Sequence, residues 1–178
     1  SVGFDLYCKL VEDMVKDIRG KKSDPRIETE LDLMVKGFIP KDYVPDLNQR
    51  LDFYRRMQVA SEYDEGLAIA SELEDRYGPH PEAIEKLLAL LKIRMLCQKI
   101  HISKIELKHN DVYLHLLPST AINPEILTSL FDERLSMQSE YKIKIRLDRK
   151  GWKTDLKLVA NYLQRLANSL LPVEIDNE

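Results

Sequence analysis

The alternation of apolar and polar residues along the chain predicts a mixture of helices and strands. Apolar residues recur every three to four positions in five long stretches, which is the spacing of one helix face. These predicted helices cover residues 3–19, 46–57, 61–77, 81–100 and 154–171, and a shorter one follows Asn123-Pro124. Two-residue alternation, typical of half-buried strands, occurs at residues 30–36, on both sides of a turn at 109–111, and at 141–147. The pattern predicts an α+β fold, with a helical layer packed on a small, mostly antiparallel β-sheet.

Polar residues at the ends of these stretches support the predicted helix limits. Asp46 and Ser61 are each followed three residues later by a Gln or an Asp, which is the spacing of a capping box. Gly78 follows the third long helix, where a left-handed residue commonly ends a helix. Residues 81–100 are apolar on several sides, so this stretch is predicted to be the central helix.

Composition and motif content give no support for an enzyme. The chain has 178 residues, a net charge of −3, six glycines, two cysteines and four histidines. Neither GxGxxG nor GxxxxGK[ST] is present, and the histidines show no metal-ligand spacing such as HxxxH. Cys8 and Cys97 each lie in an apolar helical pattern, so we expect two reduced, buried thiols. The sequence therefore predicts no catalytic residue, no cofactor and no metal ion.

The two ends of the chain are expected to lie apart from the main domain. Residues 20–29 are mostly polar and charged, which favours a linker, so residues 1–29 are predicted to be a helix and linker before a domain at 30–172. Residues 173–178 are acidic and are expected to fray. The chain starts without Met, in helical register by Phe4, which indicates a piece of a longer protein. No signal peptide or membrane span is found, so a cytoplasmic location is expected.

The predicted helix at 61–77 carries an unusual concentration of negative charge. Six carboxylates and no Lys or Arg lie between Ser61 and Asp75. On a helical wheel, the side opposite the apolar stripe gathers four acids around the small Ala68: Asp64, Glu65, Glu72 and Asp75. Like charges three or four residues apart destabilise a helix, so a face that carries them is a candidate docking surface for a basic partner. A solvated face that keeps the domain soluble explains the charges equally well.

A second candidate surface is basic and lies near the C-terminal end. Alternation places one row of cations on the outer side of the predicted strand at 141–147, and more follow after it: Lys142, Lys144, Arg146, Arg149 and Lys150. Such a patch can contact phosphates of nucleic acid, and Trp152 beside it can stack on a base. We favour a simpler interpretation of the same residues, in which they form a solvated strand face. Lysines on such a face also prevent edge-to-edge pairing of sheets.

Two long motifs stand out between residues 39 and 81. The first is IP-x-D-Y-V-P-D-x-N-x-R-L-x-F-Y-R-R, from Ile39 to Arg56, and the second is E-L-x-D-R-Y-G-P-x-P, from Glu72 to Pro81. Both motifs resemble the C-terminal domain of the bacterial transcription-repair coupling factors. The opening GFDLY, at Gly3–Tyr7, resembles the junction that follows the translocase motor of that family. The resemblance covers most of the chain and is looser beyond about Asp111.

The resemblance implies a function that the residues alone do not. The full-length proteins of the family are ATP-dependent DNA translocases, which displace stalled RNA polymerase from DNA and recruit the excision-repair protein UvrA. ATP and Mg²⁺ belong to a motor outside this chain. The C-terminal domain is a non-catalytic, autoinhibitory regulatory domain that packs on the UvrA-binding module of the same protein. Acidic residues of the second motif, here Glu72 and Asp75, pair with arginines of that module. Glu74 stands where the family often has an aliphatic residue.

Three hypotheses follow for the chain itself. The first is an intramolecular interaction module that uses the acidic helix, and the second is a nucleic-acid-binding accessory domain that uses residues 142–153. An enzyme is the third, and no motif supports it. Because Glu72 and Asp75 are both predicted opposite the apolar stripe, reversing their charges is expected to leave the fold intact.

Overall fold

A computed structural model describes residues 28–118, 120 and 123–170 of the chain. The predicted helix at 3–19, the linker as far as residue 27, Cys8 and the tail at 173–178 lie outside the described residues. The described part forms two compact units, one of residues 35–95 and one of residues 28–34 with 96–170. Within these residues, no helix has the length and apolarity needed to cross a bilayer.

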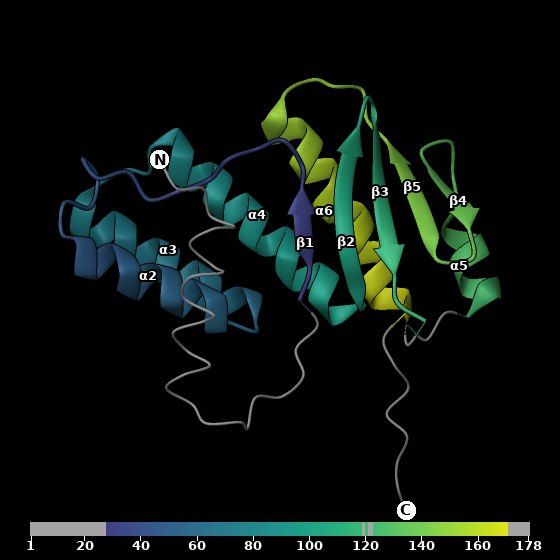
Figure 1. The fold of residues 1–178 in the computed structure, drawn as a ribbon, viewed down its shortest axis with the longest axis horizontal. Helices are drawn as coiled ribbons and strands as arrows, with labels where there is room; N and C mark the ends of the chain where they lie inside the picture. The colour runs from purple at the N-terminus through teal and green to yellow at the C-terminus, as the bar shows by residue number, and fades with distance from the viewer. Residues whose placement is uncertain (1–27, 119, 121–122, 171–178) are drawn as a thin grey trace, which may run out of the picture. The chain divides into compact units, whose positions relative to one another are not determined.

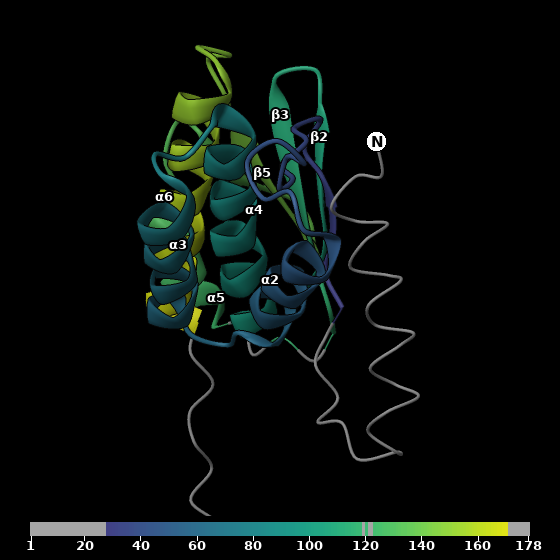
Figure 2. The same ribbon diagram turned by 90° about the vertical axis from the view of Figure 1, so that its left-hand side faces the viewer.

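Helices make up most of the first unit. They are α2 (Leu47–Val59), α3 (Tyr63–Tyr77) and α4 (Glu82–Lys99), of which α4 belongs to this unit as far as Met95. Apolar residues at helical spacing meet in one core: Phe53, Tyr54 and Met57 of α2, Ile69 and Leu73 of α3, and Ile84, Leu87, Leu91 and Met95 of α4. Figure 2 shows the three helices next to one another. Each of the three predicted helices thus contributes buried residues to this core, while Leu47, Tyr63 and Leu67 of the predicted apolar stripes are exposed.

The caps of these helices partly match the predicted ones. Asp46 is the N-cap of α2, and its carboxylate accepts a hydrogen bond from the amide of Gln49 at 2.8 Å. The predicted cap of α3 at Ser61 is wrong, because Glu62 is the N-cap residue. The Glu65 carboxylate accepts hydrogen bonds from the amides of Ser61 and Glu62. Gly78 ends α3 with φ of +88°, as the sequence predicted for a residue in a conformation that favours glycine.

An extended segment before α2 packs against the helices. Tyrosine hydroxyls form hydrogen bonds between the segment and the helices, and a glycine allows the segment to approach α4 closely. The Tyr54 hydroxyl accepts a hydrogen bond from the amide of Ile39 at 2.6 Å. The Tyr43 hydroxyl donates toward the carbonyls of Leu73 and Gly78 at the end of α3, and burial raises its pKa. A Cβ on Gly37 would lie 2.3 Å from the Leu87 amide nitrogen, so the chain passes directly against α4 there.

The second unit is built on a five-stranded sheet of order β1-β2-β3-β5-β4 (Figure 1). Its strands are β1 (Glu30–Asp32), β2 (Ile102–Lys108), β3 (Asp111–Leu116), β4 (Leu135–Ser139) and β5 (Lys142–Arg146). Only the β1–β2 pair is parallel, so the prediction of an α+β fold with a mostly antiparallel sheet is confirmed. The predicted strand at 30–36 is shorter than expected, and β4 was not predicted.

The sheet has one apolar and one polar face. Ile105, Leu114 and Ile143 are buried neighbours across β2, β3 and β5. Two further helices are α5 (Pro124–Leu130), capped by Asn123, and α6 (Trp152–Leu170). Figures 1 and 2 show α6 along one face of the sheet. Its buried residues recur at helical spacing, as predicted for residues 154–171: Leu156, Val159, Leu163 and Leu166.

The polar face is organised around Glu106, whose side chain is only 8% exposed. Its carboxylate contacts Lys108 Nζ at 2.9 Å, His115 Nε2 at 2.9 Å and Lys104 Nζ at 3.7 Å. His115 thus lies on the polar face, opposite Lys104 of β2. The hydrogen bonds from Lys108, the larger cause, and from His115 hold the pKa of Glu106 at about 2.

Candidate docking surface on the acidic helix

The outer side of α3 carries the acidic residues that the sequence singled out. Ile69 and Leu73 are buried, while Asp64, Ala68 and Asp75 are exposed. The side chains of Asp64 and Asp75 make no hydrogen bond or ion pair with any other residue that the structure describes. Two carboxylates about 16 Å apart along the helix axis, at 1.5 Å per residue, are therefore available for a partner.

Glu72 is placed differently, because it forms ion pairs within the first unit. Its carboxylate accepts hydrogen bonds from Arg56 Nη2 of α2 at 2.6 Å and from Arg76 Nη1 at 2.9 Å. The bond from Arg56 is the main cause that lowers the pKa of Glu72, and the same bond raises the pKa of Arg56. Both guanidinium groups also lie over the ring of Phe53, at 5.4 and 5.6 Å from its centroid. Glu72 therefore joins α2 to α3.

Glu65 also has a role inside the unit. Its carboxylate binds the amide groups that precede α3, at 2.7 Å for Ser61 and 3.3 Å for Glu62. A carboxylate at this position satisfies helix N–H donors and interacts favourably with the helix dipole. Of the four predicted docking residues, Asp64 and Asp75 are thus available, while Glu65 and Glu72 stabilise the helix and its packing. Their predicted contact with a partner stays a prediction.

Reversing the charge of Glu72 is expected to weaken the first unit. Glu72→Lys removes two ion pairs and places three cations together, so we expect a loss of about 1–2 kcal/mol in the free energy of unfolding after allowance for solvent screening. The loss should be present above pH 4.5 and shrink as the pH falls, because the stabilisation belongs to the ionised carboxylate whose pKa is lowered in the folded state. Urea denaturation followed by circular dichroism measures it.

The matched control is Asp75→Lys, which changes the same charge on the same helix at a residue without an ion pair among the described residues. Equal unfolding midpoints for the two variants would contradict a structural role of Glu72. The effect of both reversals stays a prediction: Asp75→Lys is expected to leave the stability unchanged, whereas Glu72→Lys is expected to lower it.

The predicted basic patch is divided by the structure. Lys142 and Lys144 lie half-buried on the polar face of the sheet, with Lys142 Nζ 4.6 Å from the centroid of the Tyr113 ring. Each of the other three cations faces a carboxylate: Arg146 with Asp111 at 3.6 Å, Arg149 with Asp155 at 3.9 Å, and Lys150 with Asp148 at 3.8 Å. Trp152 is half-buried at the start of α6. These pairs reduce the positive charge that the sequence alone suggested.

Sequence analysis did not predict the ion pair between Arg56 of α2 and Glu72 of α3. The spacing of Glu72 and Arg76 predicts an ion pair on one helix. No comparable signal predicts the pair with Arg56, because it depends on how α2 and α3 pack. The count of six carboxylates singled out α3 but could not separate the acids that form ion pairs from Asp64 and Asp75, which form none among the described residues.

The family model described as TRCF domain matches residues 33–127, which is more than half of the chain. The chain belongs to the TRCF domain family. It is 43% identical over 97 residues to the transcription-repair-coupling factor of Myxococcus xanthus, which covers 53% of the chain. It is 27% identical over 180 residues to the factor of the same name from Escherichia coli (strain K12), which covers 96% of the chain. The names of these relatives connect the family with transcription-coupled DNA repair.

The fold of this chain is also similar to that of a solved structure. A crystal structure of the C-terminal domain of transcription-repair coupling factor superposes with a TM-score of 0.72 at 16% sequence identity, over 80% of this chain and 94% of that one. The chain spans 8% of the length of the Myxococcus xanthus relative and 16% of that of the Escherichia coli relative. It thus corresponds to a small part of those proteins, and the motifs at Ile39–Arg56 and Glu72–Pro81 lie inside the matched range.

Proposed function

We propose that this chain is an autoinhibitory interaction domain that docks on the UvrA-binding module of the same cytoplasmic protein. Asp64 and Asp75 would bind cationic side chains of that module and so restrict access to its UvrA surface. The observation that carries the proposal is the exposure of these two carboxylates, without any ion pair among the described residues, on a helix of the family motif. Two exposed carboxylates on the same side of a helix can both pair with cations of one basic partner.

The proposal extends to the full-length protein through the family. That protein would be an ATP-dependent DNA translocase that displaces stalled RNA polymerase and brings UvrA to the lesion. ATP and Mg²⁺ would be used by its motor, and this domain would hold no cofactor and catalyse no reaction. A nucleic-acid-binding role for residues 142–153 has less support, since three of the five predicted cations face carboxylates.

Reversing the two available carboxylates is expected to abolish docking without loss of fold. In calorimetry of this chain with the separately purified UvrA-binding module, Asp64→Lys/Asp75→Lys should lower the affinity at least tenfold at low salt, because two attractive contacts become repulsive. Moderate salt should weaken binding of the unmodified chain in the same direction. Circular dichroism should show an unchanged unfolding midpoint for the variant.

The matched control reverses two other exposed acids, Asp42 and Glu133, which gives the same change in net charge. The Asp42→Lys/Glu133→Lys variant should bind as the unmodified chain does. Equal losses in both double variants would mean that only net charge matters. Absence of binding by the unmodified chain at low salt, and UvrA binding by the full-length protein that is the same with and without this domain, would contradict the proposal.

A further inference from the structure

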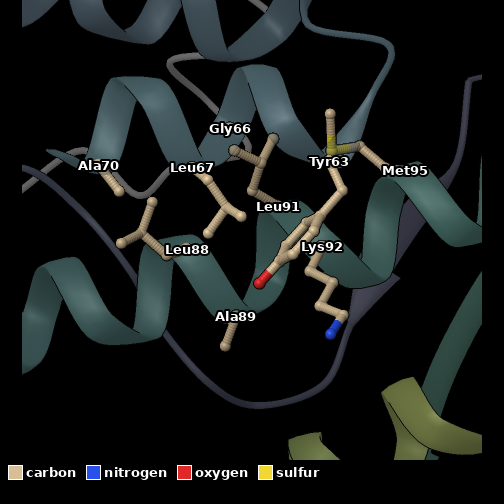
Figure 3. Close-up of a pocket in the computed structure, with 9 residues that line it drawn as sticks. All are labelled: Tyr63, Gly66, Leu67, Ala70, Leu88, Ala89, Leu91, Lys92 and Met95. Carbon is tan, nitrogen blue, oxygen red and sulfur yellow. The ribbon is translucent and has the colours of Figure 1, made fainter. Parts of the chain in front are cut away.

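A groove of about 170 Å³ lies between α3 and α4 in the first unit. Its lining is apolar apart from one lysine: Tyr63, Gly66, Leu67, Ala70, Leu88, Ala89, Leu91, Lys92 and Met95. Figure 3 shows Tyr63 and Leu67 reaching from α3 toward α4 on either side of Gly66. The helices approach closely at Gly66, where a Cβ would lie 3.4 Å from Leu91 Cδ2, so the floor of the groove is formed by packed helices.

The side chains at the mouth of this groove are unusually exposed for their type. Leu67 is 47% and Tyr63 is 45% exposed, although both lie on the side of α3 that faces α4. Lys92 Nζ lies 4.7 Å from the centroid of the Tyr63 ring and closes one end of the apolar surface. Apolar side chains gathered around a hollow, rather than scattered singly, indicate an interaction site.

The groove borders the available carboxylates. With 100° per residue, Leu67 lies between the buried stripe of α3 and the outer face that carries Asp64 and Asp75. A segment that places cations on both carboxylates must run about 16 Å along the helix, and it passes the groove on the way. The two carboxylates require this partner segment to be basic. An acidic segment would be repelled by them, and a purely apolar segment would leave them unpaired.

We propose that the groove receives an aliphatic side chain from the same cationic segment that pairs with Asp64 and Asp75. This inference rests on the proposed function. It adds an apolar anchor, by which we mean the aliphatic side chain of the partner that is bound in the groove. The partner is a basic amphipathic segment whose positive side chains flank one buried aliphatic residue. Ion pairs alone give salt-sensitive, weak association, whereas an apolar side chain enclosed in a pocket adds affinity that salt does not screen.

The test uses two synthetic helical peptides of equal positive charge, one composed of Lys and Leu and one with every Leu replaced by Ser. We expect the Lys/Leu peptide to bind at least tenfold more tightly at moderate salt and to shift the methyl NMR signals of Leu67, Leu88 and Met95. Leu67→Ser should reduce its binding to the level of the Lys/Ser peptide. Leu47→Ser is the matched control, since Leu47 is a leucine on α2 with 51% exposure, and it should change nothing.

The outcomes separate the anchor from the docking function. Equal binding of both peptides, or methyl shifts that occur away from the groove, would overturn the anchor. The anchor is also overturned if the Asp64→Lys/Asp75→Lys variant of this chain loses affinity for the UvrA-binding module while the Leu67→Ser variant keeps it. That result would still agree with the proposed function. Peptide binding in the groove together with no binding of the module would instead contradict the proposed function.

Discussion

A Gly37→Ala substitution is expected to unfold the first compact unit. The added Cβ would lie 2.3 Å from the amide nitrogen of Leu87, 2.4 Å from its Cα and 2.8 Å from the carbonyl carbon of Lys86. All three atoms are backbone atoms inside α4, so no side-chain rotation relieves the overlap. Because Phe38 donates a hydrogen bond to the Ala83 carbonyl at 3.2 Å, moving the segment outward also breaks its attachment to α4.

We expect the substitution to cost about 3 kcal/mol or more, above the usual range for overpacking because backbone meets backbone. Thermal unfolding followed by far-UV circular dichroism, together with amide hydrogen exchange of α2 and α3, measures the effect. Gly66→Ala is the control, since its Cβ would meet only a side-chain atom, at 3.4 Å, and alanine favours a helix more than glycine does. A melting temperature for Gly37→Ala close to that of Gly66→Ala would refute the close contact.

The sequence predicted those elements whose signal is local. Alternation located β2, β3 and β5, and helical spacing located α2, α3, α4 and α6, because each has one buried side. β1 ends early since Met34 has φ of +55° and is 81% exposed, which interrupts the alternation that was read through it. β4 was missed because only Leu135 among its five residues is fully buried, so the strand lacks a clear apolar face.

For the candidate site, sequence predicted the surface but not the role of each acid. Composition and helix spacing placed Asp64 and Asp75 on an exposed face, and the structure has them there. Glu72 lies on the edge of that face toward α2, where Arg56 reaches it at 2.6 Å. A contact of this kind depends on the packing of two helices, and 16 residues separate the partners. The groove at Leu67 is equally invisible in sequence, because it arises from the spacing of α3 and α4.

A Glu106→Gln substitution is expected to destabilise the second unit and to change its acid unfolding. The contacts with Lys108, the larger cause, and with His115 lower the pKa of Glu106 from an ordinary value of 4.5 to about 2. A shift of this size corresponds to about 3 kcal/mol, and screening at the exposed lysine reduces the expected loss to about 1–2 kcal/mol at pH 7. The amide keeps the shape and an acceptor oxygen of the carboxylate but loses its charge.

The sign of the pH dependence follows from the direction of the shift. Because the folded state holds the carboxylate ionised down to about pH 2, its stabilisation is complete above pH 4.5 and is lost as the pH falls from 4.5 toward 2. The stability difference between the unmodified chain and Glu106→Gln should therefore be largest at neutral pH and disappear near pH 2. Urea denaturation at a series of pH values, followed by fluorescence of Trp152, measures this difference. Trp152 is the sole tryptophan of the chain and lies in the second unit.

Glu30→Gln provides the control for Glu106→Gln, because Glu30 contacts the same Lys104 at 3.0 Å but is 65% exposed. A solvated carboxylate of this kind contributes little to stability, so the variant should unfold like the unmodified chain at every pH. If both variants showed the same pH profile, the polar face would act through its total charge alone. A difference confined to Glu106→Gln would establish one nearly buried carboxylate as the centre of that face. This carboxylate contacts Lys108 on its own strand and joins β2 to β3 through His115.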